Sequence, residues 1–301
     1  MEHSSSTAGG ASMSVADQGC FAASNRFSAG CLKHYAEEGW VLLKGLFDVE
    51  RDLVPIHRNI NKLIELKLNQ LGIVPVESGD SAQIRNRDFM QIVCSERDKA
   101  GEIYRACRHL LPLHVLSVKE ELIELACRYI GTAWINYLPY TAVRIDVLGE
   151  ENYLFPWHQD YPYTQGSIDG IVIWAPLFDV PVGHGHVRII PRSHLSGLRQ
   201  VHLADPGNAN RNGARTISII GEERLDEEPF VEAAVNVGDA LVFNTLLLHR
   251  STPSGSGTVR WTFQLRYANF ANPDAVRRGW PGGMIEGIGF EKDHPEFVVD
   301  R

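Results

Sequence analysis

The chain has 301 residues, of which 44% are hydrophobic and 22% charged, a composition typical of an ordinary globular protein. Its formal net charge of −8 and its pI of about 5.8 argue against a general nucleic-acid binder, which would usually be basic. No run reaches the length of a transmembrane helix and no secretory signal is visible, so we expect a cytoplasmic protein without a membrane partner. The five cysteines have no C-x-x-C spacing, which favours reduced thiols.

The composition divides the chain into segments. Residues 1–26 are rich in Ser, Ala and Gly, and we expect them to form a disordered tail. The rest, 27–301, is predicted to be a single domain. Its predicted parts are a helical N-terminal part over 27–132, a β core over 133–270 and a Gly- and Pro-rich C-terminal tail over 271–301.

The helical part combines amphipathic runs with glycine stops. A short helix ending at Gly39 precedes a strand over residues 40–46. The next helix runs from Asp48 to Gly72, because its apolar residues keep helical spacing. The segments that follow are predicted as a loop over 73–98 and helices over 99–111 and 117–130.

From Trp134 onward the chain consists of short β-type runs separated by Gly, Pro, Asp and Asn. Two of these runs are G-I-V-I-W-A-P at 170–176 and V-R-W-T-F-Q-L-R-Y at 259–267. Several short strands with turn signals indicate a sandwich or barrel, and the lack of strand–helix alternation argues against a doubly wound α/β sheet. The predicted fold class is mainly β with flanking α: N-terminal helices on a double-stranded β-helix (jelly-roll, cupin-like) core.

A possible metal site begins in the run P-W-H-Q-D at 156–160. His158 and Asp160 are two residues apart, so their side chains share a face if the segment is extended. Alone, the two residues fit a surface ion pair as well as two thirds of a metal site. His249 ends the apolar run F-N-T-L-L-L-H, and Arg260 lies eleven residues further on, in the next predicted strand.

Two imidazoles and one carboxylate on one side of a metal form the facial triad of non-haem Fe(II) enzymes, which leaves coordination positions open. A bidentate 2-oxo acid and O₂ would fill those positions. The distal carboxylate of 2-oxoglutarate then needs a fixed cation, and an arginine fork suits a planar carboxylate. Arg266 shares a strand face with Arg260 and is the alternative for this role.

Several of these segments together resemble a known family. H-Q-D at 158–160, V-G-D-A-L-V-F-N-T-L-L-L-H-R-S at 237–251 and Arg260 are similar to the phytanoyl-CoA dioxygenase (PhyH) family of Fe(II)- and 2-oxoglutarate-dependent oxygenases. The segment H-Y-A-E-E-G-W-V-L-L-K-G-L-F also matches, so the resemblance spans residues 27–270. It implies a double-stranded β-helix. It also implies that the catalytic iron ligands are His158, Asp160 and His249.

The resemblance also implies roles around the cosubstrate. Arg260 would pair with the distal carboxylate of 2-oxoglutarate, supported by the hydroxyl of Ser251. Gln159 would touch the cosubstrate and Trp174 would line the pocket. Arg144, on the strand before H-Q-D, would contact cosubstrate or substrate.

One loop departs from the family pattern. Where the family often has a P-G-S-H turn, this chain has Arg192 in place of the glycine, with His184, His186 and Arg188 nearby, and the role of this loop stays open. We expect its histidines to be solvated or hydrogen-bonded and not to form a second metal site. Because Asp160 is retained, the resemblance implies hydroxylation or another outcome of hydrogen abstraction, and not halogenation.

The resulting hypothesis is a hydroxylase that uses Fe(II), 2-oxoglutarate and O₂ to oxidise an aliphatic carbon, with release of succinate and CO₂. Its substrate is expected to be a small, polar molecule, such as a secondary metabolite or a sugar, in natural product biosynthesis. The alternatives are a non-catalytic binding protein of the same fold and a zinc-dependent cupin-type isomerase. The sequence indicates no oligomeric state. Tyr161 and Tyr163 fit either core aromatics or the mouth of the pocket.

Overall fold

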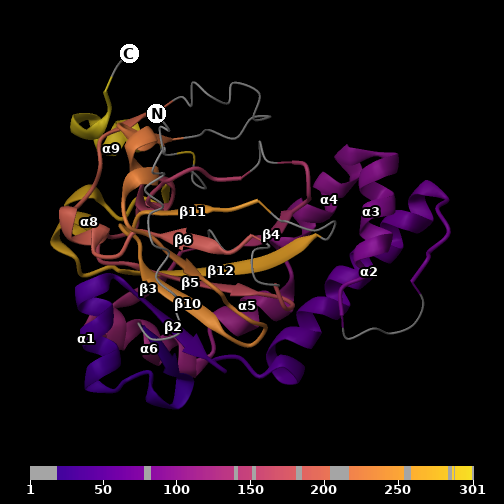
Figure 1. Cartoon of the computed structure of the whole chain (residues 1–301), viewed down its shortest axis with the longest axis horizontal. Coiled ribbons are helices and arrows are strands. Elements are labelled where there is room, and N and C mark those ends of the chain that lie inside the picture. Colours follow the sequence, from indigo (N-terminus) through magenta and orange to yellow (C-terminus); the bar gives the residue numbers. More distant parts are fainter. Residues whose placement is uncertain are drawn as a thin grey trace, which may run out of the picture.

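The computed structural model describes residues 19–77, 83–138, 142–150, 154–180, 185–203, 217–253, 259–283, 287 and 289–299. Helices dominate the first part of the chain and strands the second (Figure 1). The helices are α1 (Ala29–Glu38), α2 (Val54–Leu71), α3 (Asn86–Ser95), α4 (Arg97–Cys107), α5 (Leu111–Ser117), α6 (Glu120–Ile130), α7 (Tyr161–Thr164), α8 (Pro273–Arg278) and α9 (Phe290–Asp293).

The strands form two main sheets and a short ribbon. In the order in which they pair, the seven-stranded sheet contains β1 (Cys20–Ala22), β2 (Trp40–Lys44), β10 (Ala240–Asn244), β5 (Ile171–Pro176), β12 (Arg260–Asn269) and β3 (Ile135–Tyr137), with β4 (Ala142–Asp146) also paired to β12. The three-stranded sheet contains β11 (His249–Ser251), β6 (Val187–Ile189) and β9 (Val231–Ala233). The ribbon contains β7 (Val201–His202) and β8 (Ser218–Ile219).

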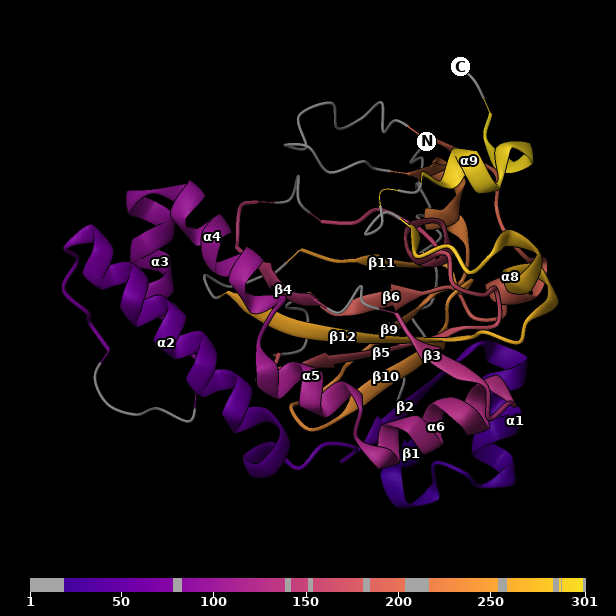
Figure 2. The same ribbon diagram turned by 180° about the vertical axis from the view of Figure 1, so that it is seen from behind.

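The connections between the two main sheets are those of a jelly roll. Along the chain β4, β5, β10 and β12 belong to the large sheet, while β6, β9 and β11 belong to the small one. An isolated bridge between His158 and His249 extends the small sheet beyond β11. Strands therefore cross from sheet to sheet, and Figure 2 shows β11 and β6 stacked over β12, β5 and β10. The predicted β core with flanking helices is confirmed.

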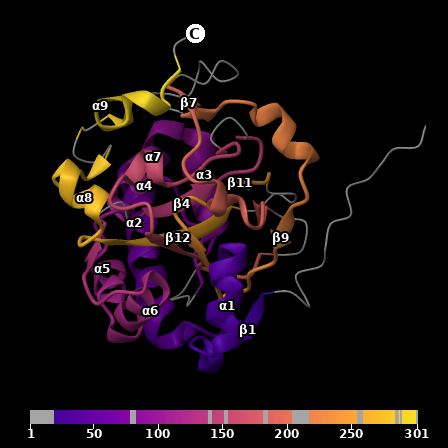
Figure 3. The same cartoon turned by 90° about the vertical axis from the view of Figure 1, so that its left-hand side faces the viewer.

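The two faces of β12 differ sharply in character. Its outward side chains belong to the largest apolar core, which also contains buried residues of α1, α2 and α6; they are Trp261, Phe263, Leu265 and Tyr267. Its inward side chains are polar and buried or nearly so: Arg260, Thr262, Gln264 and Arg266. Because side chains alternate along a strand, one strand serves both the core and the space between the sheets. In Figure 3, α5 and α6 lie on one side of β12 and β11 on the other.

Ordered structure begins earlier than predicted. β1 pairs in parallel with β2, with Cys20 opposite Leu42, so residues 19–26 do not belong to a disordered tail. The exposed edge of β2 offers unpaired backbone groups that this short segment satisfies, and Phe21 packs against the apolar core. The rest of the predicted tail, 1–18, lies outside the described residues.

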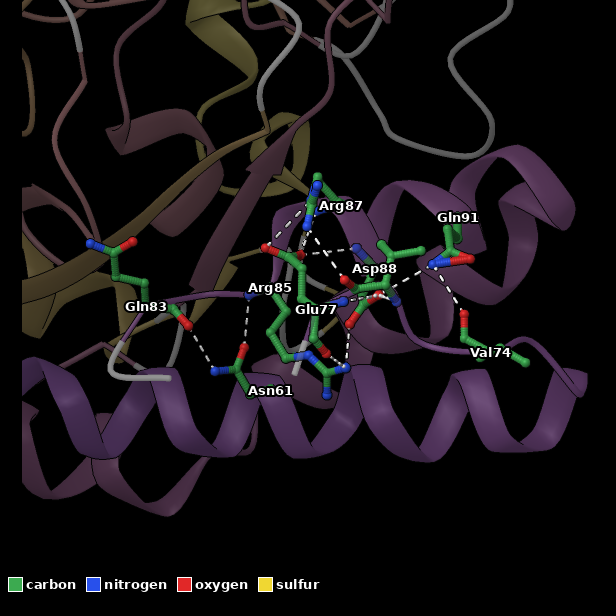
Figure 4. Close-up of polar contacts among 9 residues, drawn as sticks. Asn61, Val74, Glu77, Gln83, Arg85, Arg87, Asp88 and Gln91 are labelled. Atoms are coloured by element: carbon green, nitrogen blue, oxygen red, sulfur yellow. Dashed lines mark hydrogen bonds and ion pairs between the residues drawn. The ribbon is translucent and has the colours of Figure 1, made fainter. Parts of the chain in front are cut away.

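The predicted loop over 73–98 contains helix α3, so the loop prediction is wrong for residues 86–95. One side of α3 is apolar, with Phe89 and Ile92 buried. Figure 4 shows the polar cluster at its start, where the buried Asp88 accepts hydrogen bonds from the backbone N–H groups of Val76 (2.7 Å) and Glu77 (3.3 Å) and also contacts Arg85. The helix therefore depends on a carboxylate that ties the preceding loop to it.

Helix α3 is also fastened to β12. The Asn86 side-chain oxygen accepts a hydrogen bond from the Trp261 indole at 2.7 Å, and the Phe89 ring meets the Trp261 ring edge-on at 4.9 Å. Trp261 directly follows Arg260 in the chain. The start of α3 therefore supports the outer face of the strand whose inner face carries the arginines.

The C-terminal segment packs beside the run that contains His158. The Tyr161 hydroxyl lies 2.9 Å from His294 Nε2, and both Tyr161 and Phe290 are buried in one apolar cluster. Tyr163 is buried in the same cluster, so both tyrosines are core aromatics. Within the described residues, no helix combines the length and apolar character needed to cross a bilayer.

Asp88→Ala should lower the free energy of unfolding by about 3 kcal/mol, because it removes the carboxylate that Arg85 and two backbone N–H groups share in a buried place. Urea unfolding followed by circular dichroism measures the loss. Arg87→Ala is the matched control, since its side chain is 73% exposed and should cost less than about 1 kcal/mol. Equal effects of the two substitutions would contradict this account of the cluster.

Candidate functional site

His158, Asp160 and His249 converge between the two sheets. The backbones of His158 and His249 pair directly, with N–H···O distances of 2.9 and 3.1 Å, so their imidazoles lie on the same face with ring centroids 4.1 Å apart. Asp160 Oδ1 lies 3.6 Å from His158 Nε2 and 3.7 Å from His249 Nε2. One ligand atom from each of the three buried residues lies within 4.8 Å of the others, so the group could hold a metal ion.

The two imidazoles present their Nε2 atoms as ligands. His158 Nδ1 lies 2.8 Å from the Pro156 carbonyl oxygen, and His249 Nδ1 lies 2.9 Å from that of Leu247. Because a carbonyl only accepts hydrogen bonds, each Nδ1 carries a hydrogen, and Nε2 is the ring nitrogen that could bind a metal. Burial and the neighbouring His158 lower the pKa of His249 to about 3, although Asp160 opposes them, so this ring is neutral near pH 7.

Asp160 is held by its second oxygen. Arg266 Nε donates to Asp160 Oδ2 at 2.8 Å, while Oδ1 faces the two imidazoles. Burial alone would raise the pKa of Asp160, but Arg266 and both histidines hold that pKa well below its usual range. Arg266 was the alternative to Arg260 as a carboxylate clamp; here it contacts Asp160.

These donors fit a divalent transition metal. Two neutral imidazoles and one ionised carboxylate are the ligands of the non-haem Fe(II) facial triad, and zinc accepts the same donors. Each histidine also has the hydrogen-bonded Nδ1 typical of metal-ligating histidines. Among the described residues, no other group of His, Cys, Asp and Glu side chains converges in this way.

Arg260 and Arg144 lie around one carboxylate, Asp146. Arg260 Nε and Nη2 both donate to Asp146 Oδ2, at 3.1 and 2.8 Å, and Arg260 Nη1 donates to the Thr252 carbonyl oxygen at 3.3 Å. Arg144 Nε lies 2.8 Å from Asp146 Oδ1, and the Arg144 guanidinium covers the Phe155 ring at 4.9 Å. Phe155 in turn lies 5.0 Å from the His158 ring, so this cluster borders the histidines.

The other predicted cosubstrate residues differ in position. Trp174 is buried on the inner face of β5, in the core between the sheets. Ser251 follows His249 on β11 and shares its face of the strand. Gln159 points elsewhere: its amide group donates to the carbonyls of Gly197 and Leu246 and accepts from the Arg199 N–H. A contact of Gln159 with the cosubstrate is therefore not favoured by this arrangement.

The loop with the unusual histidines and arginines lies beside the site. His184 is outside the described residues, whereas His186 is buried and its carbonyl accepts the Thr252 hydroxyl at 2.6 Å. Arg188 pairs with Glu232 at 2.9 Å on the neighbouring strand β9. Arg192 adopts a left-handed φ of 67°, the conformation that a turn glycine favours.

Asp146 and the contact between Arg266 and Asp160 were not predicted from the sequence. A signal for Asp146 was present, since R-I-D at 144–146 has the same alternation as H-Q-D and places Arg144 and Asp146 on one strand face. No local signal links Arg266 to Asp160, because the two residues are 106 positions apart in the chain.

Comparisons with known proteins identify relatives of this chain. The family model of phytanoyl-CoA dioxygenase (PhyH) matches residues 36–261. The chain is 32% identical over 225 residues to a 1-deoxypentalenic acid 11-beta-hydroxylase from Streptomyces arenae and 25% identical over 231 residues to one from Streptomyces exfoliatus, with 74% of each chain covered in both cases.

Among solved structures, that of EctD from S. alaskensis with 2-oxoglutarate and 5-hydroxyectoine aligns with a TM-score of 0.49 at 17% identity, covering 81% of this chain and 77% of that one. The family match includes all three residues of the candidate metal site and extends over most of the chain. The chain therefore belongs to the phytanoyl-CoA dioxygenase (PhyH) family and is an enzyme of the dioxygenase type.

Proposed function

We propose that this enzyme is an Fe(II)- and 2-oxoglutarate-dependent hydroxylase that oxidises an aliphatic carbon of a small, polar molecule, with release of succinate and CO₂. The observation that carries the proposal is the convergence of His158, Asp160 and His249. Three ligands on one side of iron leave positions for a 2-oxo acid and O₂. The two relatives from Streptomyces are hydroxylases by name, which supports hydroxylation as the outcome.

In this proposal His158, Asp160 and His249 bind iron, and the residues around them fix the orientation of these three side chains. Iron(II) bound there would supply the activation of dioxygen that hydroxylation of an aliphatic carbon requires, while the protein supplies orientation and shielding. The backbone carbonyls of Pro156 and Leu247 fix the imidazole tautomers. Arg266 fixes the carboxylate of Asp160 by its second oxygen, so that Oδ1 remains directed at the metal position.

Arg260 is the proposed partner of the distal carboxylate of 2-oxoglutarate. Its Nη1 reaches the carbonyl of Thr252, three residues beyond His249 in the chain, which corresponds to about 10 Å of extended strand. A dicarboxylate that chelates iron at His249 would therefore extend along β11 towards Arg260. Ser251 lies between these two points and would add its hydroxyl, while Trp174 would line the space between the sheets.

The proposed choice of a polar substrate rests on the side chains beside the triad. Arg144 covers the Phe155 ring, which lies next to His158, so both a cation and an aromatic surface border the metal position. Burial of His158, Asp160 and His249 keeps bulk water away from the reacting atoms. Such an environment suits a small molecule with polar groups better than a long acyl chain.

His158→Ala should abolish metal binding at this site. Anaerobic titration of the apo-protein with Fe(II) and then 2-oxoglutarate should give a visible iron-to-2-oxoglutarate charge-transfer band in the wild type and none in the variant. The loss of iron affinity should exceed the about 10- to 100-fold typical of losing an outer hydrogen-bond partner. His109→Ala, an exposed histidine, is the control and should keep the band. Wild-type protein that binds iron but shows neither the band nor succinate release would exclude the proposed reaction.

Arg260→Ala should raise the dissociation constant of 2-oxoglutarate at least about 30-fold, because one partner of a buried charge pair is removed. The same anaerobic titration measures this constant. Affinity for Fe(II) should stay unchanged, since Arg260 does not contact the triad. Wild-type affinity for 2-oxoglutarate in this variant would rule out Arg260 as the clamp.

Arg266→Gln should show the opposite pattern. Affinity for Fe(II) should fall about 10- to 100-fold, because the variant loses the guanidinium that orients Asp160. Direct iron titration in the absence of 2-oxoglutarate isolates this effect. A variant with unchanged iron affinity and weakened 2-oxoglutarate binding would reverse the assignment of the two arginines.

A further inference from the structure

The buried guanidinium of Arg260 and the half-buried guanidinium of Arg144 share one buried carboxylate at one end of the large sheet. Asp146 on β4 is the direct cross-strand partner of Arg260 on β12, and Arg144 lies two residues before Asp146 on the same face. Asp146 is 5% exposed and Arg260 is 3% exposed. Among the described residues, Asp146 is the one carboxylate that Arg260 contacts, and Arg260 shares it with Arg144.

The contacts of Arg260 leave a specific part of its guanidinium available. Asp146 Oδ2 accepts hydrogen bonds from Arg260 Nε at 3.1 Å and from Nη2 at 2.8 Å. The Thr252 carbonyl oxygen accepts a third one, from Nη1, at 3.3 Å. A guanidinium has five N–H groups, so one on each Nη has no partner among the described residues. Two N–H groups of that kind can bind a carboxylate in a bidentate manner.

The position of Arg260 is restricted on several sides. A Cβ atom at Gly185 would lie 2.5 Å from Arg260 Nη1, so the guanidinium uses space that only glycine leaves at that point of the loop. The Arg144 guanidinium holds Asp146 from the other side, with 2.8 Å between Nη2 and Oδ1. Arg144 is itself supported by the Phe155 ring, next to His158. This series of contacts links the position of Arg260 to the metal triad.

Asp146 is shared by two guanidiniums, so it does not serve Arg260 alone. A carboxylate bound to the available N–H groups of Arg260 would form charge-assisted hydrogen bonds with them. A ligand with a carboxylate at a fixed distance from its metal-chelating end supplies such a group.

We propose that Asp146 is a positioning residue for Arg260. It fixes the Arg260 guanidinium at the distance from the metal triad that the distal carboxylate of 2-oxoglutarate requires. This inference rests on the proposed function. Asp146 does not touch the cosubstrate. It accepts hydrogen bonds from Nε and Nη2 of Arg260 and so orients the remaining N–H groups towards the distal carboxylate. The residue therefore contributes to selection among 2-oxo acids by length and by the presence of a second carboxylate.

Asp146→Asn tests the proposal. The dissociation constant of 2-oxoglutarate, measured by anaerobic titration of the iron-loaded protein, should rise about tenfold, because the amide holds Arg260 less firmly than the carboxylate does. The dissociation constant of pyruvate, a 2-oxo acid without a distal carboxylate, should stay unchanged. The affinity for Fe(II) should also stay unchanged. Asp179→Asn, an exposed aspartate that accepts one backbone N–H, is the matched control.

Asp146→Glu adds a readout of position. This substitution keeps the charge but lengthens the side chain, so it should shift the Arg260 guanidinium. The preference for 2-oxoglutarate over the shorter dicarboxylate oxaloacetate should therefore fall. A role of Asp146 in folding alone would not change the ratio of these two affinities. Circular dichroism confirms that each compared variant is folded.

Three outcomes would overturn the inference. Wild-type affinity for 2-oxoglutarate in Asp146→Asn would mean that Arg260 needs no support. An equal loss for 2-oxoglutarate and pyruvate would assign Asp146 to the general stability of the site. Wild-type protein that binds iron but not 2-oxoglutarate would refute the proposed function itself, and that result is seen before any variant is compared.

Discussion

The alternation of side chains along β12 (Arg260–Asn269) is the constraint on which both the core and the site depend. Trp261, Phe263 and Leu265 fill the apolar core against the helices, and the residues between them face the space between the sheets. A slip of one residue in the pairing with β4 or β5 would turn arginines into the core and aromatics into the site. The packing of Trp261 against α3 therefore helps to secure the register of the functional side chains.

Buried charges on that inner face are paired, not isolated. Arg266 pairs with Asp160, and Arg260 pairs with Asp146. In both pairs the two residues come from segments that are far apart in the chain. Removing such groups from water is costly, and an apolar replacement of similar volume would often stabilise a protein equally well. Their presence here is best explained by the need for fixed charges beside a metal and an anionic cosubstrate, and not by stability.

The small sheet supplies the complementary half of the site. The bridge between His158 and His249 sets the distance between the imidazoles through backbone hydrogen bonds, so that no side chain has to impose it. β11 ends at Ser251, and the carbonyl of the next residue, Thr252, accepts a hydrogen bond from Arg260. The backbone of one short strand thus relates the metal triad to the proposed carboxylate clamp.

The sequence alone determined the kind of fold and the three residues of the candidate metal site. Short β runs with turn signals fixed the class, and the spacing of His158, Asp160, His249 and Arg260 carried the family resemblance, because these are local patterns or intervals that a chain displays directly.

Only the tertiary structure decided how the charges pair. Arg266 meets Asp160 and Arg260 meets Asp146 across more than a hundred residues, through sheet register that no local pattern encodes. It also decided that Gln159 turns to backbone groups, and that residues 86–95 form helix α3, whose Phe89 packs against Trp261.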